Sequence, residues 1–184
     1  MKSIQGLFIL LSFLILTACQ PQLKEFQPAN DSLFKITFSY PADWNWEEDI
    51  PFDEPPLNVE LPPSERIILA NGDLQSGSIT IQVYYASPAS LVNIKDEIDS
   101  YSGDFAFTVL SNIAFQIDGN DARWFTLSGI AYSAQGKIAT QNEVIYLFSE
   151  DRYYEITLFV LETKKDERFH KQFEGLIKSI KVLQ

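Results

Sequence analysis

The feature that most constrains the fold is a run of four predicted strands, at residues 108–117, 122–132, 137–149 and 152–161. In the last of them, Tyr154, Ile156, Leu158 and Val160 form one wholly apolar face, as in a strand that buries one side. Only short turn sequences separate them: Asp118-Gly119-Asn120, Gln135-Gly136 and Glu150-Asp151. Because tight turns join antiparallel neighbours, this half of the chain predicts a mostly antiparallel sheet.

Three further strands are expected earlier in the chain, at residues 33–40, 66–70 and 78–85. The segment 78–85 alternates most regularly, with Ile79, Ile81 and Val83 on one side. Between the first two strands, residues 50–64 carry five prolines, which disrupt strand ladders and helices alike. We therefore expect a long loop there.

Two helices complete the pattern. Ser87-Pro88 is typical of a helix start, and an apolar stripe follows at helical spacing: Leu91, Ile94, Ile98 and Tyr101. Thr163 can cap a second, terminal helix, whose stripe is Phe169, Phe173, Leu176, Ile177 and Ile180. The order predicts an α+β domain, with an antiparallel sheet of about six or seven strands and a helix on each side.

The N-terminus predicts export and lipid attachment. Lys2 precedes an apolar run at residues 7–16, which is about half the length of a membrane-spanning helix and is typical of a signal peptide. The run ends in Leu16-Thr17-Ala18-Cys19, which resembles the bacterial lipobox. That resemblance implies diacylglycerol on the Cys19 sulfur and cleavage before it, so residues 1–18 would be a lipoprotein signal peptide. The alternative is an ordinary signal peptide with an incidental cysteine.

The predicted anchor determines the expected location. Residues 19–31 are polar with two prolines and no periodicity, so they are expected to form a lipidated tether before a single domain at residues 32–184. Acyl chains on Cys19 would hold the protein to a membrane. Gln20 follows, rather than aspartate, which favours the outer membrane facing the periplasm in a two-membrane host, and otherwise the outer face of the cytoplasmic membrane.

Composition excludes several classes of function. The chain is 46% hydrophobic, which favours a packed interior, and its net charge of −11 disfavours nucleic-acid binding. Cys19 is the only cysteine, so with its sulfur lipidated no disulfide or cysteine nucleophile is available. No cofactor or metal site is expected.

The strand end Phe38-Ser39-Tyr40-Pro41-Ala42-Asp43-Trp44 resembles the opening motif of PsbP-like domains, the family of photosystem II extrinsic proteins and related bacterial lipoproteins, including the DcrB-like group. The hairpin Gly119-Asn120-Asp121-Ala122 and the ending Ile177-Lys178-Ser179-Ile180 are also similar. The resemblance implies an α/β/α sandwich without a catalytic constellation, used for docking or assembly. The basic docking patches and metal-binding histidines of some members have no counterpart here.

Candidate chemistry is sparse. His170 is the only histidine and is expected on the surface of the terminal helix, and no nucleophile-elbow, zincin or phosphate-loop motif occurs. One acidic cluster, flanked by aromatic residues, remains in the long loop: Glu47, Glu48, Asp49, Asp53 and Glu54. Three interpretations of this cluster are open. A glycosidase site needs two carboxyls at a defined separation, and a calcium site needs six to eight oxygen ligands. A solvated acidic loop requires neither arrangement.

We expect a membrane-anchored, non-catalytic binding or assembly domain with a protein partner in the cell envelope. Long loops are often functional, so its docking residues are predicted to be Trp44, Trp46, Phe52, Glu47, Glu48 and Asp49. One alternative is a carboxylate-based hydrolase acting on envelope polysaccharide. The other is a small-molecule or lipid carrier, which would need a cavity between helix and sheet.

Overall fold

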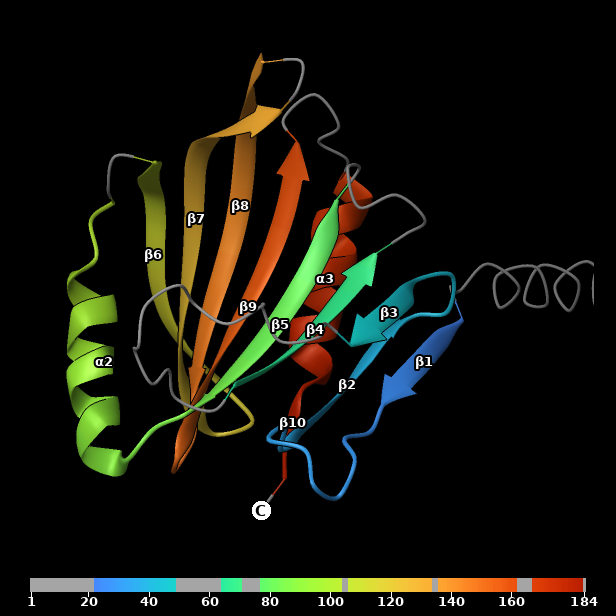
Figure 1. Ribbon diagram of the computed structural model, residues 1–184, viewed down its shortest axis with the longest axis vertical. Helices are drawn as coiled ribbons and strands as arrows, with labels where there is room; N and C mark the ends of the chain where they lie inside the picture. Colours follow the sequence, from blue (N-terminus) through green and yellow to red (C-terminus); the bar gives the residue numbers. More distant parts are fainter. Residues whose placement is uncertain are drawn as a thin grey trace, which may run out of the picture.

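A computed structural model describes residues 22–48, 64–70, 77–103, 106–133, 136–161 and 167–183 (Figure 1). Its main sheet has seven strands in the order β3-β4-β5-β9-β8-β7-β6. Their bounds are β3 Asn45–Glu48, β4 Ser64–Ala70, β5 Ser78–Tyr85, β6 Phe107–Ile117, β7 Asn120–Ser133, β8 Gly136–Phe148 and β9 Arg152–Leu161. Each neighbouring pair is antiparallel, which confirms the predicted sheet.

The turn between β6 and β7 shows how local sequence determines the register. Asp118 and Gly119 both have positive φ, at 49° and 82°, as a two-residue type I′ turn requires. Ile117 pairs with Asn120 across this turn. The Asp-Gly turn thus closes the hairpin that the sequence predicts.

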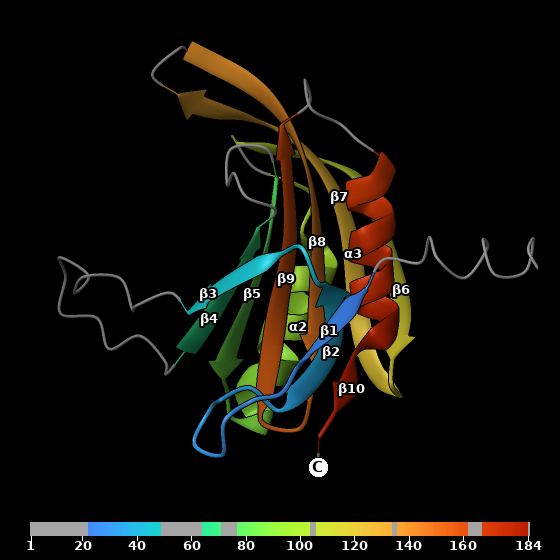
Figure 2. The ribbon, with the colours of Figure 1, turned by 90° about the vertical axis from the view of Figure 1, so that its right-hand side faces the viewer.

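Helix α2, Pro88–Ser100, and helix α3, Glu167–Ser179, cover opposite faces of the main sheet (Figures 1 and 2). The Ser87 side chain caps α2 by accepting from the Ser90 N–H at 3.2 Å. Alternate residues of β8 divide between the two faces, with Ile145 packing on the α3 side and Val144 on the α2 side. The predicted helix on each side of the sheet is confirmed.

A second sheet of three strands, in the order β1-β2-β10, lies on the same face as α3. Its strands are β1 Leu23–Phe26, β2 Ile36–Pro41 and β10 Lys181–Val182. The predicted strand at residues 33–40 therefore belongs to this sheet, because Phe34, Ile36 and Phe38 pack into the core that α3 shares.

Two predictions about irregular segments are wrong. The expected tether at residues 19–31 contains β1, which pairs with β2 and buries Phe26. The long loop was expected to hold Glu47 and Glu48, but both lie in β3, which pairs with β4; residues 50–63 lie outside the described residues. Both strands are four residues long, too short for alternation to identify them.

Within the described parts of the chain, no helix is long and apolar enough to cross a membrane.

Candidate functional site

A cleft of about 360 Å³ lies between α2 and the main sheet. It exists because α2 covers its face of the sheet thinly, with Leu91 as its one buried residue. Residues from α2, β7, β8 and β9 contribute to the lining, which is Glu97, Ile98, Tyr101, Phe107, Leu127, Asn142, Val144, Tyr146, Glu155 and Thr157. Its volume lies within the range of small-molecule sites.

Strand register brings the polar lining residues together. Tyr146 of β8 lies opposite Glu155 of β9, and Val144 lies opposite Thr157. Asn142, two residues before Val144, lies opposite Leu127 of β7. Since alternate residues of a strand share a face, these side chains form one continuous floor beneath α2.

Asn142 is the polar group in this floor that the fold leaves unsatisfied. Its side chain is 5% exposed, and its Oδ1 accepts no hydrogen bond from any described residue. Leaving a buried acceptor unpaired costs about 1–3 kcal/mol. Such an atom in the lining of a cleft is a ready acceptor for a ligand N–H or O–H.

Glu155 is the second acceptor of the floor. Burial raises the pKa of its carboxyl, and the hydrogen bond with Thr157 only partly opposes that effect. Its charge contributes, after burial itself, to raising the pKa of Tyr84 to about 12. Burial and then the charge of Glu155 also raise the pKa of Tyr146. The carboxylate therefore lies among tyrosines, without a counter-charge among the described residues.

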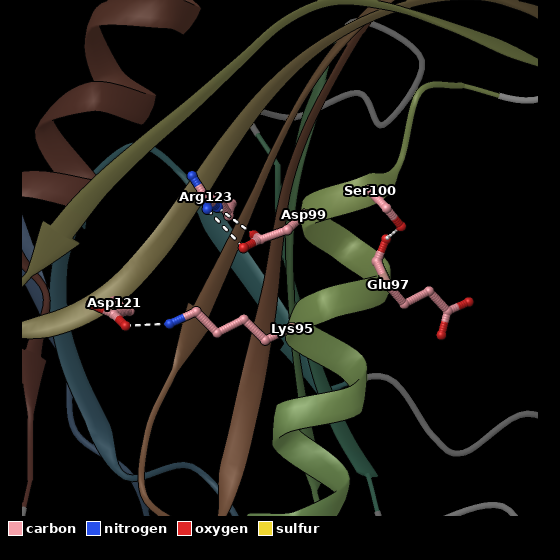
Figure 3. A network of polar contacts seen from close by, with 6 residues as sticks. All are labelled: Lys95, Glu97, Asp99, Ser100, Asp121 and Arg123. Atoms are coloured by element: carbon pink, nitrogen blue, oxygen red, sulfur yellow. Dashed lines mark hydrogen bonds and ion pairs between the residues drawn. The ribbon is translucent and has the colours of Figure 1, made fainter.

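Two ion pairs hold α2 against β7. They lie on the opposite side of the helix from the Glu97 carboxylate (Figure 3). The Arg123 Nη2 lies 2.7 Å from the Asp99 carboxylate, and Lys95 pairs with Asp121. These pairs lower the pKa of both aspartates. Figure 3 shows the Glu97 carboxylate projecting away from both pairs. The basic residues that hold the helix are thus neutralised by aspartates, while Glu97 lines the cleft.

One wall of the cleft depends on a glycine. The ring of Phe107 packs directly over Gly129 of β7, whose pairing partner it is. A Cβ at position 129 would lie only 2.5 Å from the Phe107 Cδ1. Gly129 therefore lets the aromatic ring lie flat against the sheet and form part of the lining.

His170, predicted on the surface of the terminal helix, is partly exposed, with 20% of its side chain accessible to solvent. Its Nδ1 contacts the Glu143 carboxylate, and its Nε2 is buried without a partner among the described residues. The Trp124 indole also donates to Glu143, at 3.0 Å. This cluster lies on the α3 face, opposite the cleft, because Phe169 and Phe173 turn this side of α3 toward the core.

The predicted docking residues do not form one surface. Trp44 is fully buried and packs edge-on against Phe169, so it belongs to the core. The backbone of Trp46, Glu47 and Glu48 lies in β3. The remaining predicted site residues, Cys19, Asp49 and Phe52, lie outside the described residues.

The sequence alone does not single out Glu97 on α2, or Asn142 and Glu155 within long strands. For the two strand residues the available signal was weak, since each has only one apolar or aromatic neighbour two positions away, Val144 for Asn142 and Tyr153 for Glu155. No group of three potential metal-binding side chains occurs in the part of the chain that the structure describes.

Comparison with known proteins shows the fold. No family model and no curated protein matches the sequence. A crystal structure from Bacteroides thetaiotaomicron VPI-5482 superposes with a TM-score of 0.58 at 14% identity, over 88% of this chain and 48% of that one. This chain therefore spans about half the length of that protein.

The solution structure of cyanobacterial PsbP (CyanoP) from Synechocystis sp. PCC 6803 has a TM-score of 0.51 at 9% identity, over 89% of this chain and 94% of that one. LpqN of Mycobacterium tuberculosis, described as involved in cell envelope biogenesis, has a TM-score of 0.44, too low to support an argument. The similarity to CyanoP covers nearly the whole of both chains. The chain thus has a PsbP-like fold.

Proposed function

We propose that this protein is a lipid-anchored, non-catalytic binding protein of the cell envelope, and that its domain holds a small molecule in the cleft beneath α2. The observation that carries the proposal is the buried, unpartnered Oδ1 of Asn142 in the lining of that cleft. Folded proteins pair the great majority of their buried polar atoms. Among the described residues three buried side-chain atoms lack a partner, and of these only the Asn142 Oδ1 lines the cleft, where a bound ligand would satisfy it.

The rest of the lining supports this role. Aromatic and aliphatic side chains form most of the walls, and a few polar groups lie among them, as in small-molecule sites generally. A helix that closely covered the sheet would have argued against a carrier. Here α2 instead leaves the floor accessible beside Ile98 and Tyr101.

Anchoring is proposed from the lipobox-like sequence that ends at Cys19. Attached acyl chains would keep the domain at a membrane, where it would receive or retain its ligand and meet a protein partner. Because Gln20, rather than aspartate, follows Cys19, the proposed site is the outer membrane in a two-membrane host and otherwise the outer face of the cytoplasmic membrane.

A thermal-shift screen of the full chain tests the binding role. A ligand of the cleft should raise the melting temperature of the wild type and should have little effect on Asn142→Leu, which replaces the unpaired acceptor with an apolar side chain of similar size. Equal stabilisation of both proteins by every active compound would place binding elsewhere and contradict the proposal.

A carboxylate-based hydrolase is the second candidate, because Glu97 and Glu155 line the same cleft. The raised pKa of Glu155 also suits a general acid. This candidate predicts release of reducing ends from envelope polysaccharide, and loss of that release in Glu155→Gln. The binding role predicts no release by either protein.

A further inference from the structure

We propose that the ligand of the cleft is a small organic cation with an apolar body, such as an alkyl- or arylammonium. This inference rests on the proposed function, since it names the ligand class of the same cleft.

The polar groups of the cleft are mainly acceptors. Asn142 offers its unpaired Oδ1, and Glu97 and Glu155 offer carboxylates. Lysine and arginine are absent from the described lining. The hydroxyls of Tyr101, Tyr146 and Thr157 can act either as donors or as acceptors. The Asn142 Oδ1 and the two carboxylates can only accept, so the cleft favours a ligand that donates hydrogen bonds.

Nearby basic residues do not satisfy these acceptors. Lys95 and Arg123 pair with Asp121 and Asp99, on the other side of α2 from Glu97 (Figure 3). Arg66 lowers the pKa of Tyr84, but the groups that act on the Glu155 carboxyl are burial and Thr157.

A positive ligand would remove an energetic cost that the fold leaves in place. Glu155 is half-buried on the covered face of β9 with no counter-charge among the described residues, and moving a carboxylate out of water is costly unless it is paired. An ammonium group donates up to three hydrogen bonds, which suits a carboxylate acceptor.

The walls favour an organic cation over a metal ion. Tyr101, Phe107 and Tyr146 present aromatic surface to the same cleft. Ring faces attract organic ammonium groups and also bury an apolar body. A hard metal ion would need several converging oxygen ligands, whereas most of this lining is apolar or aromatic.

Three compounds that share one ring separate charge from shape: tryptamine, which is an ammonium at neutral pH, the neutral tryptophol, and the anionic indole-3-acetate. Their binding to the full chain, purified in a non-ionic detergent, is measured by calorimetry. We expect tryptamine to bind at least tenfold more tightly than either of the others.

The variants locate the effect. Glu155→Gln and Asn142→Leu should each weaken tryptamine binding at least fivefold. Glu174→Gln removes one negative charge from the exposed side of α3, where Glu174 pairs with Lys178, and should leave binding unchanged. This control separates the cleft from a general attraction of cations to a chain of net charge −11.

Equal losses of affinity in Glu155→Gln and Glu174→Gln would overturn the inference, as would failure of tryptamine to bind. Preference for tryptophol or indole-3-acetate, lost in Asn142→Leu, would overturn the cationic ligand but leave the cleft as a binding site. If no compound of any charge depended on Asn142, the proposed function itself would fail.

Discussion

Replacement of Gly129 by alanine should destabilise the protein, although alanine usually stabilises a strand relative to glycine. The new Cβ would lie 2.5 Å and 2.6 Å from the Phe107 Cδ1 and Cε1. Carbon atoms in contact normally lie about 3.5–4.0 Å apart, so the ring must retreat by about 1 Å. The Cβ would also lie 3.0 Å from the Ala106 carbonyl oxygen, which limits how far the backbone can relax.

The expected magnitude follows from two opposing effects. Overpacking of this kind costs about 1–3 kcal/mol, and the lower chain entropy of alanine returns about 0.5–1 kcal/mol. The net loss of unfolding free energy should be about 1–2 kcal/mol. For a chain of this size that lowers the melting temperature by roughly 2–8 °C.

Urea unfolding of four proteins tests this reasoning: the wild type, Gly129→Ala, Phe107→Ala and the double variant. Without the Phe107 ring, Gly129→Ala should become neutral or stabilising, so the cycle should show a coupling equal to the overpacking cost, about 1–3 kcal/mol. Gly175→Ala is the matched control, because nothing lies within 4 Å of its added Cβ and α3 should gain stability. An equal cost of Gly129→Ala with and without the ring would show that contact with Phe107 is not what destabilises the variant.

Three further predictions concern the buried acids and the anchor. Burial raises the pKa of Glu155 in the folded state above the unfolded value of about 4.3. Between these two pKa values the folded protein binds more protons than the unfolded protein. The folded protein therefore loses stability as the pH rises through the folded pKa. Urea unfolding should therefore find Glu155→Gln more stable than the wild type at pH 7, with the difference shrinking on acidification; a constant difference would contradict this. Glu143→Ala leaves the Trp124 indole N–H without its acceptor and should cost about 1–3 kcal/mol, whereas Glu167→Ala, on the exposed side of α3, should cost under 1 kcal/mol in the same assay. Cys19→Ser should abolish labelling by radioactive palmitate and move the protein from the detergent to the aqueous phase, and retained labelling would place the lipid elsewhere.

Most of the main sheet could be predicted from sequence, because its strands are long and its turns are specific. The strands that flank Asp118-Gly119 are 11 and 14 residues long, and the turn sequence between them indicates how they pair. The stripe of Phe173, Leu176 and Ile177 likewise predicts which side of α3 is buried.

The second sheet could not be predicted, because its pairing is long-range and its strands are short. In β1, only Phe26 is buried, and the preceding polar residues resemble a linker. Strand β10 has two residues and pairs with Thr37 and Ile36 of β2, more than 140 positions earlier. The prediction of Trp44 as a docking residue is wrong for the same reason, since the residues that enclose it come from distant parts of the chain.

The cleft escaped prediction because it depends on incomplete coverage of the sheet. Glu155 lies on a face of β9 whose other residues include Tyr153 and Thr157, a mixed pattern that fits both a covered and an open face. Asn142 is equally ambiguous, because the residues two positions away from it are Thr140 and Val144, one polar and one apolar. Only the placement of α2 determines which polar residues become enclosed.

The most direct test of the cleft as the ligand site is a ¹H–¹⁵N NMR titration of the full chain with tryptamine. We expect saturable shifts concentrated at the backbone amides of Leu127, Asn142, Val144, Glu155 and Thr157, and the loss of these shifts in Glu155→Gln. Small, non-saturating shifts spread over the acidic surface, or shifts confined to the α3 face around Glu143, would show that the cleft is not the binding site.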